Sequence, residues 1–296
     1  MSAKPEERIV EGVRLSNPDK ILYPEQGVTK GILADYYVAI APLMLPHVAR
    51  RPVTMVRCPT GRGSKCFYQR HAGSGVPPQL GEIVIPGFDE PYLYISDVAG
   101  LVAMVQMGVL EIHPWGVTID HPDKADRIVF DLDPDEGLSF EDVIAAAHEV
   151  RDRLAALGLL SFVKTTGGKG LHVVVPVEPT AAWKEVKSFA KGVSAQMAAD
   201  SPERYLTKIS IAERAGRIFI DYLRNDPTST AVAPYSTRSR PGAPVAMPLP
   251  WDSVKPGLDP CDYLVTTAPA LLAKRKADPW AEMLTVKQTL PDHPRG

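Results

Sequence analysis

The spacing of apolar residues predicts two buried helices in the first part of the chain. Over residues 30–45, apolar residues recur three and four positions apart, and Thr29 precedes them as a candidate N-cap. Residues 96–113 open with Ser96, a second candidate cap, and carry an apolar run. We expect the first helix to pack in a core and the second to lead into a short strand.

The clearest helical pattern lies at residues 138–158. Ser139 and Asp142 have the spacing of a capping box, apolar residues follow at helical intervals, and Gly158 is a stop signal. Short runs rich in Val, Ile and Phe predict strands at 127–133, 161–166, 171–177 and 217–223. This alternation predicts an α/β sandwich with a mixed sheet. We expect a smaller N-terminal region at 1–120 and a catalytic core at 121–296.

Composition favours a globular chain. Its 296 residues are 45% hydrophobic and 23% charged, with a net charge of −2, so no overall basic field indicates a polyanionic partner. We find no uninterrupted apolar stretch of bilayer-spanning length, and the charged N-terminus does not resemble a secretory signal. We therefore expect a cytoplasmic protein without a membrane partner.

The cysteines offer no predicted cross-link. They are odd in number and lack the C-x-x-C spacing of a zinc site. Neither a disulfide framework nor a zinc site is expected from Cys58, Cys66 and Cys261.

Acidic residues at strand ends carry the strongest chemical signal. Side chains alternate along a strand, so Asp131 and Asp133 project from one face. Pro134 cannot continue a central strand, so the pair lies at the strand end. Two adjacent carboxylates favour a cation between them, and oxygen ligands suit Mg²⁺ or Mn²⁺. Asp221 ends another apolar strand, so three aspartates could hold two ions across a phosphoryl group. The alternatives are capping or solvation for the pair, and an ion pair with Arg217 or Arg224 for Asp221.

A glycine-rich segment lies between these strands. In Thr165-Thr-Gly-Gly-Lys-Gly-Leu-His172, the glycines permit close backbone approach to an anion, while Thr166, Lys169 and His172 can contact phosphates. The segment lacks the Walker A spacing. A tight hairpin turn, with His172 as a structural residue, is the alternative.

Further on, Arg238 and Arg240 share one face of an extended stretch and suit forked phosphate contacts; solvated arginines are the alternative.

Together these segments resemble the archaeo-eukaryotic primase superfamily, in particular the polymerase domain of bacterial ligase D. The matching segments are LSNPDKILYP, GSKCFYQRHAG, LEIHPWG, FDLDP, TTGGKGLHVVVP, FIDYLRND and APYSTRSRPGAPVAMPLPW. The resemblance implies an RRM-like catalytic core with mixed and antiparallel sheets flanked by helices. It also implies a primase-polymerase that adds nucleotides, preferentially ribonucleotides, to 3′ ends at DNA gaps and double-strand breaks in non-homologous end joining.

The resemblance assigns roles residue by residue. It implies that two Mn²⁺ or Mg²⁺ ions bind Asp131, Asp133 and Asp221. An incoming NTP or dNTP would contact Arg57, His113, Thr166, Lys169, His172, Arg238 and Arg240. DNA would contact Asn17, Lys20 and Lys30 through a downstream 5′-phosphate, Phe67, Tyr68 and Arg70 through template bases, and Arg214 through a second DNA end. Tyr68 departs from the phenylalanine that many relatives carry.

Two other functions remain open. Three carboxylates also suit a metal-dependent phosphoesterase or nuclease, although the triphosphate-like loop argues against one. A non-catalytic DNA-end-binding module is the other alternative, although the acidic and basic sets occurring together argue against it. Read without the resemblance, the lysines at 20 and 30 could be ordinary surface residues, the aromatic residues at 67 and 68 a partly buried core pair, and residues 113–115 a packing motif. The resemblance further implies a bacterial, nucleoid-associated location, with Ku and a ligase as possible partners.

Overall fold

The computed structural model describes residues 7–208 and 213–291. They form two compact units, each discontinuous in sequence. Unit 1 comprises Met1–Pro114, Val232–Ala246 and Cys261–Lys276, and unit 2 comprises Trp115–Ala231, Met247–Pro260 and Ala277–Gly296. The predicted regions 1–120 and 121–296 concern functional roles and stay a prediction.

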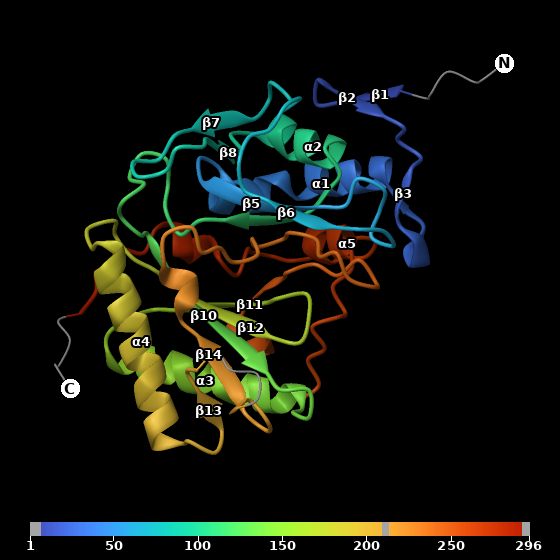
Figure 1. The fold of residues 1–296 in the computed structure, drawn as a ribbon. Helices are drawn as coiled ribbons and strands as arrows, with labels where there is room; N and C mark the ends of the chain where they lie inside the picture. The colour runs from blue at the N-terminus through green and yellow to red at the C-terminus, as the bar shows by residue number, and fades with distance from the viewer. Residues whose placement is uncertain (1–6, 209–212, 292–296) are drawn as a thin grey trace. The chain divides into compact units, whose positions relative to one another are not determined.

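Unit 1 is organised around one sheet. Within the described residues this sheet has five strands (Figure 1). The central strand β5 (Pro52–Arg57) pairs with β9 (Val109–Pro114) along its length, and with β6 (Phe67–Gln69) and β8 (Tyr92–Tyr94) in successive parts. Strand β7 (Gly81–Ile83) pairs with β8. Two small antiparallel pairs precede it: β1 (Glu7–Val10) with β2 (Val13–Ser16), and β3 (Ile21–Tyr23) with β4 (Val28–Thr29).

The helices of unit 1 largely follow the sequence pattern. Helix α1 (Lys30–Val48) packs against α2 (Val98–Gln106) and the short α5 (Ala268–Ala273). The Thr29 hydroxyl accepts a hydrogen bond from the Ile32 N–H at 3.2 Å, which confirms the predicted cap. The second predicted cap was wrong by one residue, because Asp97 and not Ser96 accepts the bond from the Gly100 N–H.

Helix α1 is long and apolar enough to cross a membrane by length and composition alone. In the structure, 56% of its apolar window is buried. Leu33, Tyr36, Tyr37 and Ile40 are almost fully buried, while Ile32 is exposed. This burial is that of a core helix.

Unit 2 confirms the predicted RRM-like core. Its sheet has the order β13-β14-β10-β12-β11-β15 within the described residues. The chain runs through β10 (Arg127–Pro134), α3 (Phe140–Ala156), β11 (Phe162–Thr165), β12 (Leu171–Pro176), α4 (Trp183–Asp200) and β14 (Ile218–Asp221). This is the split βαβ arrangement, with β10 and β12 central. Short strands β13 (Tyr205–Leu206) and β15 (Pro248–Leu249) extend the two edges.

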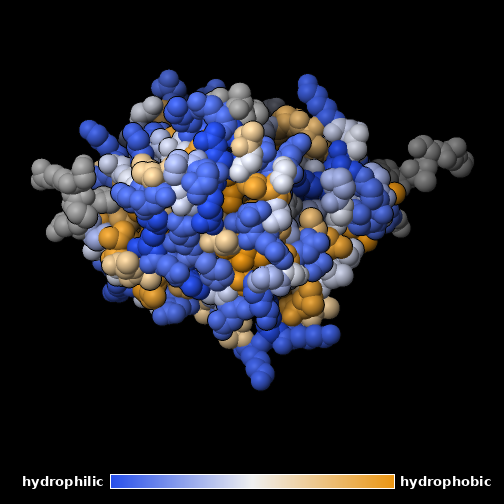
Figure 2. All heavy atoms as spheres, turned by 90° about the horizontal axis from the view of Figure 1, so that it is seen from below, coloured by the Kyte–Doolittle hydropathy of each residue, from blue (hydrophilic) through white to orange (hydrophobic). Residues whose placement is uncertain are grey.

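The two faces of this sheet differ. Ile128, Phe130 and Leu132 are fully buried on one face of β10, and α3 and α4 pack against the sheet. On the other face, Val129 lies in an apolar cluster that includes Trp280. The capping box of α3 forms as predicted, with the Ser139 hydroxyl accepting from Asp142 N–H and the Asp142 carboxylate accepting from Ser139 N–H. On the side of the molecular surface drawn in Figure 2, small apolar patches lie among hydrophilic side chains.

Candidate active site

The three candidate metal ligands lie on adjacent antiparallel strands of unit 2. In the register of β10 and β14, Asp131 lies opposite Asp221, and Asp133 lies opposite Phe219. Asp131 also lies opposite His172 on β12. Because directly opposed residues project to the same face, these five side chains share one surface of the sheet.

Burial and mutual repulsion shape the charges of this acidic cluster. Burial raises the pKa of Asp221, and the neighbouring Asp131 and Asp133 carboxylates raise it further against the opposing charge of Arg224. Burial would also raise the pKa of Asp131, but hydrogen bonding from His172 and the charge of Arg224 hold it below its ordinary value. An additional cation would relieve this crowding.

Arginines contact all three aspartates. Arg224 lies against Asp131, with Nη2 at 3.0 Å from Oδ2, and against Asp221, with Nε at 3.2 Å from Oδ2. Arg214 contacts Asp133 at 3.1 Å and stacks over the Phe219 ring. The alternative of an ion pair between Asp221 and Arg224 is therefore realised. Within residues 7–208 and 213–291, no group of three His, Cys, Asp or Glu side chains is arranged around a metal position.

His172 lies beside the acidic cluster as a buried residue. Its Nε2 is 3.2 Å from Asp131 Oδ1. Burial, together with the nearby Lys164 charge, lowers the pKa of His172 to about 4. The ring is therefore neutral at pH 7 and can orient Asp131 by hydrogen bonding.

Asn225 is a site-forming residue that the sequence analysis missed. Its buried side-chain amide accepts from the Val129 N–H and donates to the Val129 carbonyl, both at 2.8 Å. It thereby ties the short 3₁₀ helix η3 (Leu223–Asn225) to β10. The only signal in the sequence was a polar residue closely following a candidate ligand.

The glycine-rich segment forms the turn between β11 and β12, as its alternative interpretation proposed. The Thr166 hydroxyl donates to the Gly170 carbonyl at 3.1 Å and lies 3.3 Å from the Gly170 N–H. A side chain at Gly170 would come within 2.5 Å of the Leu132 carbonyl, so glycine is required by the close approach of β10. Lys169 is half-exposed, with Nζ 3.9 Å from Glu136. Its ammonium group is therefore accessible to a phosphate.

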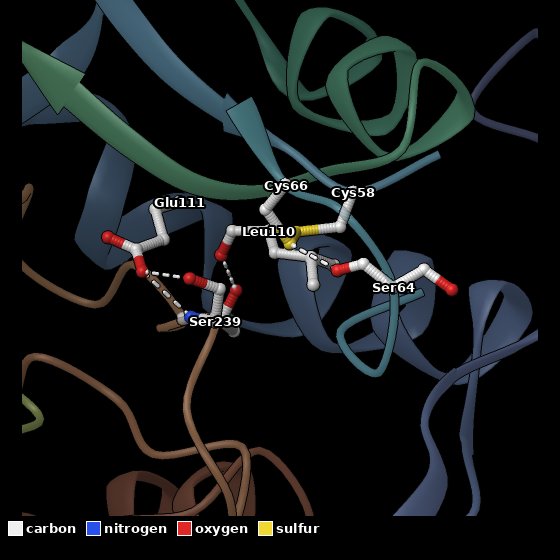
Figure 3. The surroundings of a disulfide bond; sticks show 7 residues. Cys58, Ser64, Cys66, Leu110, Glu111 and Ser239 are labelled. Atoms are coloured by element: carbon white, nitrogen blue, oxygen red, sulfur yellow. Dashed lines mark hydrogen bonds between the residues drawn. A yellow bond between two sulfur atoms is a disulfide. The ribbon is translucent and has the colours of Figure 1, made fainter. Parts of the chain in front are cut away.

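In unit 1, a buried carboxylate organises two of the predicted nucleotide contacts. Glu111 accepts hydrogen bonds from His113 at 2.8 Å and from Arg238 Nε at 2.9 Å. It also accepts from the Ser239 N–H at 2.8 Å, and Figure 3 shows Ser239 directed at this carboxylate. Burial would raise the pKa of Glu111, but His113 and Arg238 hold it well below its ordinary value. The sequence analysis missed Glu111. Arg240, another predicted nucleotide contact, is exposed.

The predicted template residues lie on β6. Phe67 and Tyr68 are 41% and 71% exposed, which is unusual for aromatic side chains and argues against a core pair. The Arg57 guanidinium lies 5.6 Å from the centre of the Phe67 ring, and the Tyr68 ring meets His113 edge-on at 6.4 Å. Arg70, the residue directly after this strand, is exposed. These side chains are available for stacking on bases.

The prediction of no disulfide was wrong. Cys58 and Cys66 are bonded, with Cα atoms 4.4 Å apart (Figure 3). The cause is the antiparallel register of β5 and β6, which pairs Arg57 with Phe67 and so makes the two cysteines the next cross-strand neighbours. Strand pairing of this kind is invisible to a count of cysteine spacing. Cys261 is exposed and takes no part in this disulfide.

The predicted 5′-phosphate residues lie together in unit 1. The Lys20 N–H donates to the Asn17 carbonyl at 3.1 Å, and the Lys30 N–H donates to the Lys20 carbonyl at 2.9 Å. Lys30 is buried, with Nζ 2.9 Å from the Ser16 carbonyl oxygen. Burial and the adjacent Lys20 charge lower the pKa of Lys30. Two neighbouring ammonium groups form a favourable environment for an anion.

Comparison with known proteins identifies a similar family. Residues 29–280 match the family model described as LigD, primase-polymerase domain. The chain is 36% identical over 283 residues to the multifunctional non-homologous end joining protein LigD of Pseudomonas aeruginosa, and 38% identical over 248 residues to that of Mycolicibacterium smegmatis. These alignments cover 94% and 82% of this chain, but only 34% and 32% of the relatives. The chain therefore spans about a third of their length.

A solved structure is also similar. The polymerase domain of Mycobacterium tuberculosis ligase D, determined in complex with DNA, superimposes with a TM-score of 0.85 and 31% sequence identity. The superposition covers 94% of this chain and 99% of that domain. The similarity thus extends over essentially the whole described fold.

Proposed function

Since the chain belongs to the LigD primase-polymerase domain family, we propose that it is a metal-dependent nucleotidyltransferase acting in non-homologous end joining. It adds nucleotides, preferentially ribonucleotides, to 3′ ends at DNA gaps and double-strand breaks. The observation that carries this proposal is the shared sheet surface of Asp131, Asp133 and Asp221. The DNA in the similar solved structure supports DNA as the partner.

The acidic cluster suits Mg²⁺ or Mn²⁺. Its donors are carboxylate oxygens, which both ions prefer. Burial first, and then the Asp131 and Asp133 carboxylates, raise the pKa of Asp221 against the charge of Arg224, so a bound cation would stabilise its ionised form. Two bound ions would supply charge neutralisation for the attacking 3′-oxygen and the departing pyrophosphate.

The chain's own residues would position the substrate. In unit 2, Thr166, Lys169 and His172 border the turn and strand that would receive a triphosphate, and Lys169 supplies the accessible positive charge. In unit 1, the proposed nucleotide contacts are Arg57, His113, Arg238 and Arg240. The proposed DNA contacts are Asn17, Lys20, Lys30, Phe67, Tyr68 and Arg70 in unit 1, and Arg214 in unit 2. Binding and alignment, more than covalent chemistry, would supply the rate enhancement.

Wider roles follow from the family and are part of the same proposal. The named relatives are non-homologous end joining proteins. We propose that this chain acts in a bacterial cytoplasm at the nucleoid, alongside Ku and a ligase.

Primer extension on gapped DNA tests the proposal. A labelled primer would be incubated with Mn²⁺ and either NTP or dNTP, on gaps with and without a downstream 5′-phosphate. We expect lengthening, faster with NTP and with the phosphate. Shortening of the primer would instead indicate a phosphoesterase or nuclease. Binding of gapped DNA without any change in primer length would indicate a non-catalytic end-binding module.

A further inference from the structure

A permanent cation already stands at the acidic cluster. The guanidinium of Arg224 places Nη2 and Nε at 3.0 and 3.1 Å from the same Asp131 oxygen, and Nε at 3.2 Å from Asp221 Oδ2. The Asp131 and Asp221 side chains are only 13% and 12% exposed, whereas that of Arg224 is 41% exposed. Arg224 therefore covers two carboxylates from the solvent side.

The position of Arg224 is set by the backbone around it. The Leu223 N–H donates to Asp221 Oδ1 at 2.9 Å, and the Asn225 amide bonds both the N–H and the carbonyl of Val129. The 3₁₀ helix η3 is thereby tied to β14 and β10 on either side of Arg224. The backbone of Arg224 is therefore held beside both carboxylates, and its planar guanidinium can contact the two from one position.

A guanidinium and a divalent ion compete for these oxygens. Arginine keeps its charge at every pH at which proteins fold, so it cannot vacate the site by losing a proton. A metal ion that takes Asp131 Oδ2 as a ligand must displace Arg224, because the contacts from Nη2 and Nε already occupy both lone pairs of that oxygen.

We propose that Arg224 is a resident counter-ion of the metal site, which bridges Asp131 and Asp221 in the metal-free protein and is displaced when divalent ions bind. This inference rests on the proposed function. Arg224 acts through the two aspartates and is in this sense a positioning residue. It stabilises the folded protein without metal, because it neutralises the buried carboxylates. It weakens metal binding, because its ion pairs with Asp131 and Asp221 must first be broken.

The inference predicts opposite changes in two measured quantities. Removing the guanidinium lowers the melting temperature of the metal-free protein, because the carboxylates lose their counter-ion. The same change tightens Mn²⁺ binding, because no arginine has to be displaced. A purely structural role for Arg224 would lower stability without improving metal affinity.

Calorimetric titration of Mn²⁺ into the wild type and three variants tests this. We expect Arg224→Ala to bind Mn²⁺ about two- to fivefold more tightly, the size expected for removal of a half-exposed competing ion pair. Arg224→Lys keeps the positive charge but loses the planar, two-pronged guanidinium. Its Mn²⁺ affinity should lie between those of the wild type and Arg224→Ala. Arg217→Ala is the matched control. Arg217 directly precedes strand β14, which Arg224 follows, but its guanidinium donates to the backbone carbonyls of Pro202 and Glu213. It should leave Mn²⁺ affinity unchanged.

Melting curves with and without saturating Mn²⁺ complete the test. We expect Arg224→Ala to melt below the wild type without metal and to approach it with Mn²⁺. Equal or weaker Mn²⁺ binding by Arg224→Ala, or by Arg224→Lys should the alanine variant not fold, overturns the inference while leaving the metal site in place. Failure of the wild type and every variant to bind Mn²⁺ overturns the proposed metal site itself.

Discussion

Replacing Glu111 by glutamine should destabilise the protein in a pH-dependent way. The side chain of Glu111 is 5% exposed and accepts hydrogen bonds from His113, Arg238 and Ser239. Glutamine keeps the shape but loses the charge, and it turns one acceptor oxygen into an NH₂ donor that faces other donors. Breaking a buried ion pair on one side costs about 3–5 kcal/mol. We expect a loss of about 3 kcal/mol at pH 7.

The pH dependence follows from the pKa of Glu111. Burial would raise this pKa, but His113 and Arg238 hold it below its ordinary value. A depressed carboxyl pKa contributes stability that is complete above the unfolded pKa of about 4.3 and is lost as pH falls toward the folded pKa. The stability difference between wild type and Glu111→Gln should therefore be constant above about pH 5 and shrink below pH 4.

Urea unfolding, followed by tryptophan fluorescence from pH 7 down to pH 3, measures this difference. Glu90→Gln is the control, because Glu90 pairs with His71 at 3.5 Å but has a side chain 71% exposed. It should change stability by less than about 0.5 kcal/mol. A Glu111→Gln loss equally small, or one that does not vary with pH, would refute the role given to Glu111.

Three further predictions follow from unit 1. Tyr68→Ala should weaken binding of a template overhang about tenfold in a fluorescence titration while Tyr68→Phe does not, because stacking needs the ring and not the hydroxyl. The double substitution of Cys58 and Cys66 by serine should lower unfolding free energy by about 2.5 kcal/mol, the loop-closure value for a sequence separation of 8; an unchanged urea midpoint would argue against the bond. Lys20→Ala should abolish the preference for gaps with a downstream 5′-phosphate, and a preserved preference would exclude it from that pocket.

Local patterns made much of the catalytic core predictable. The capping box at Ser139 fixed the start of α3, and alternation along 127–133 placed Asp131 and Asp133 on one face. Alternation could not show that Asp221 lies opposite Asp131, since strand register depends on contacts between distant segments. The position of Asp221 at a strand end suggested only that the three aspartates could share a site, and the resemblance to a known family implied the same.

The features that were missed depend on tertiary contacts. Glu111 is one carboxylate within an apolar strand, and its importance appears only when Arg238 folds back onto it. Asn225 acts through the backbone of Val129, far away in sequence. The disulfide requires the β5–β6 register. Likewise, the return of Val232–Ala246 to unit 1 leaves no signal in a chain without a low-complexity linker.

The most direct test of the central claim is incorporation of a single labelled ribonucleotide by the wild type and by Asp133→Ala, with Mn²⁺ present. The Asp133 side chain is 48% exposed and contacts Arg214, so its removal should leave the circular dichroism spectrum and melting temperature nearly unchanged. We predict that the wild type extends the primer and that the folded variant is slower by at least about a hundredfold. Extension by Asp133→Ala at the wild-type rate would contradict a catalytic role for the three aspartates.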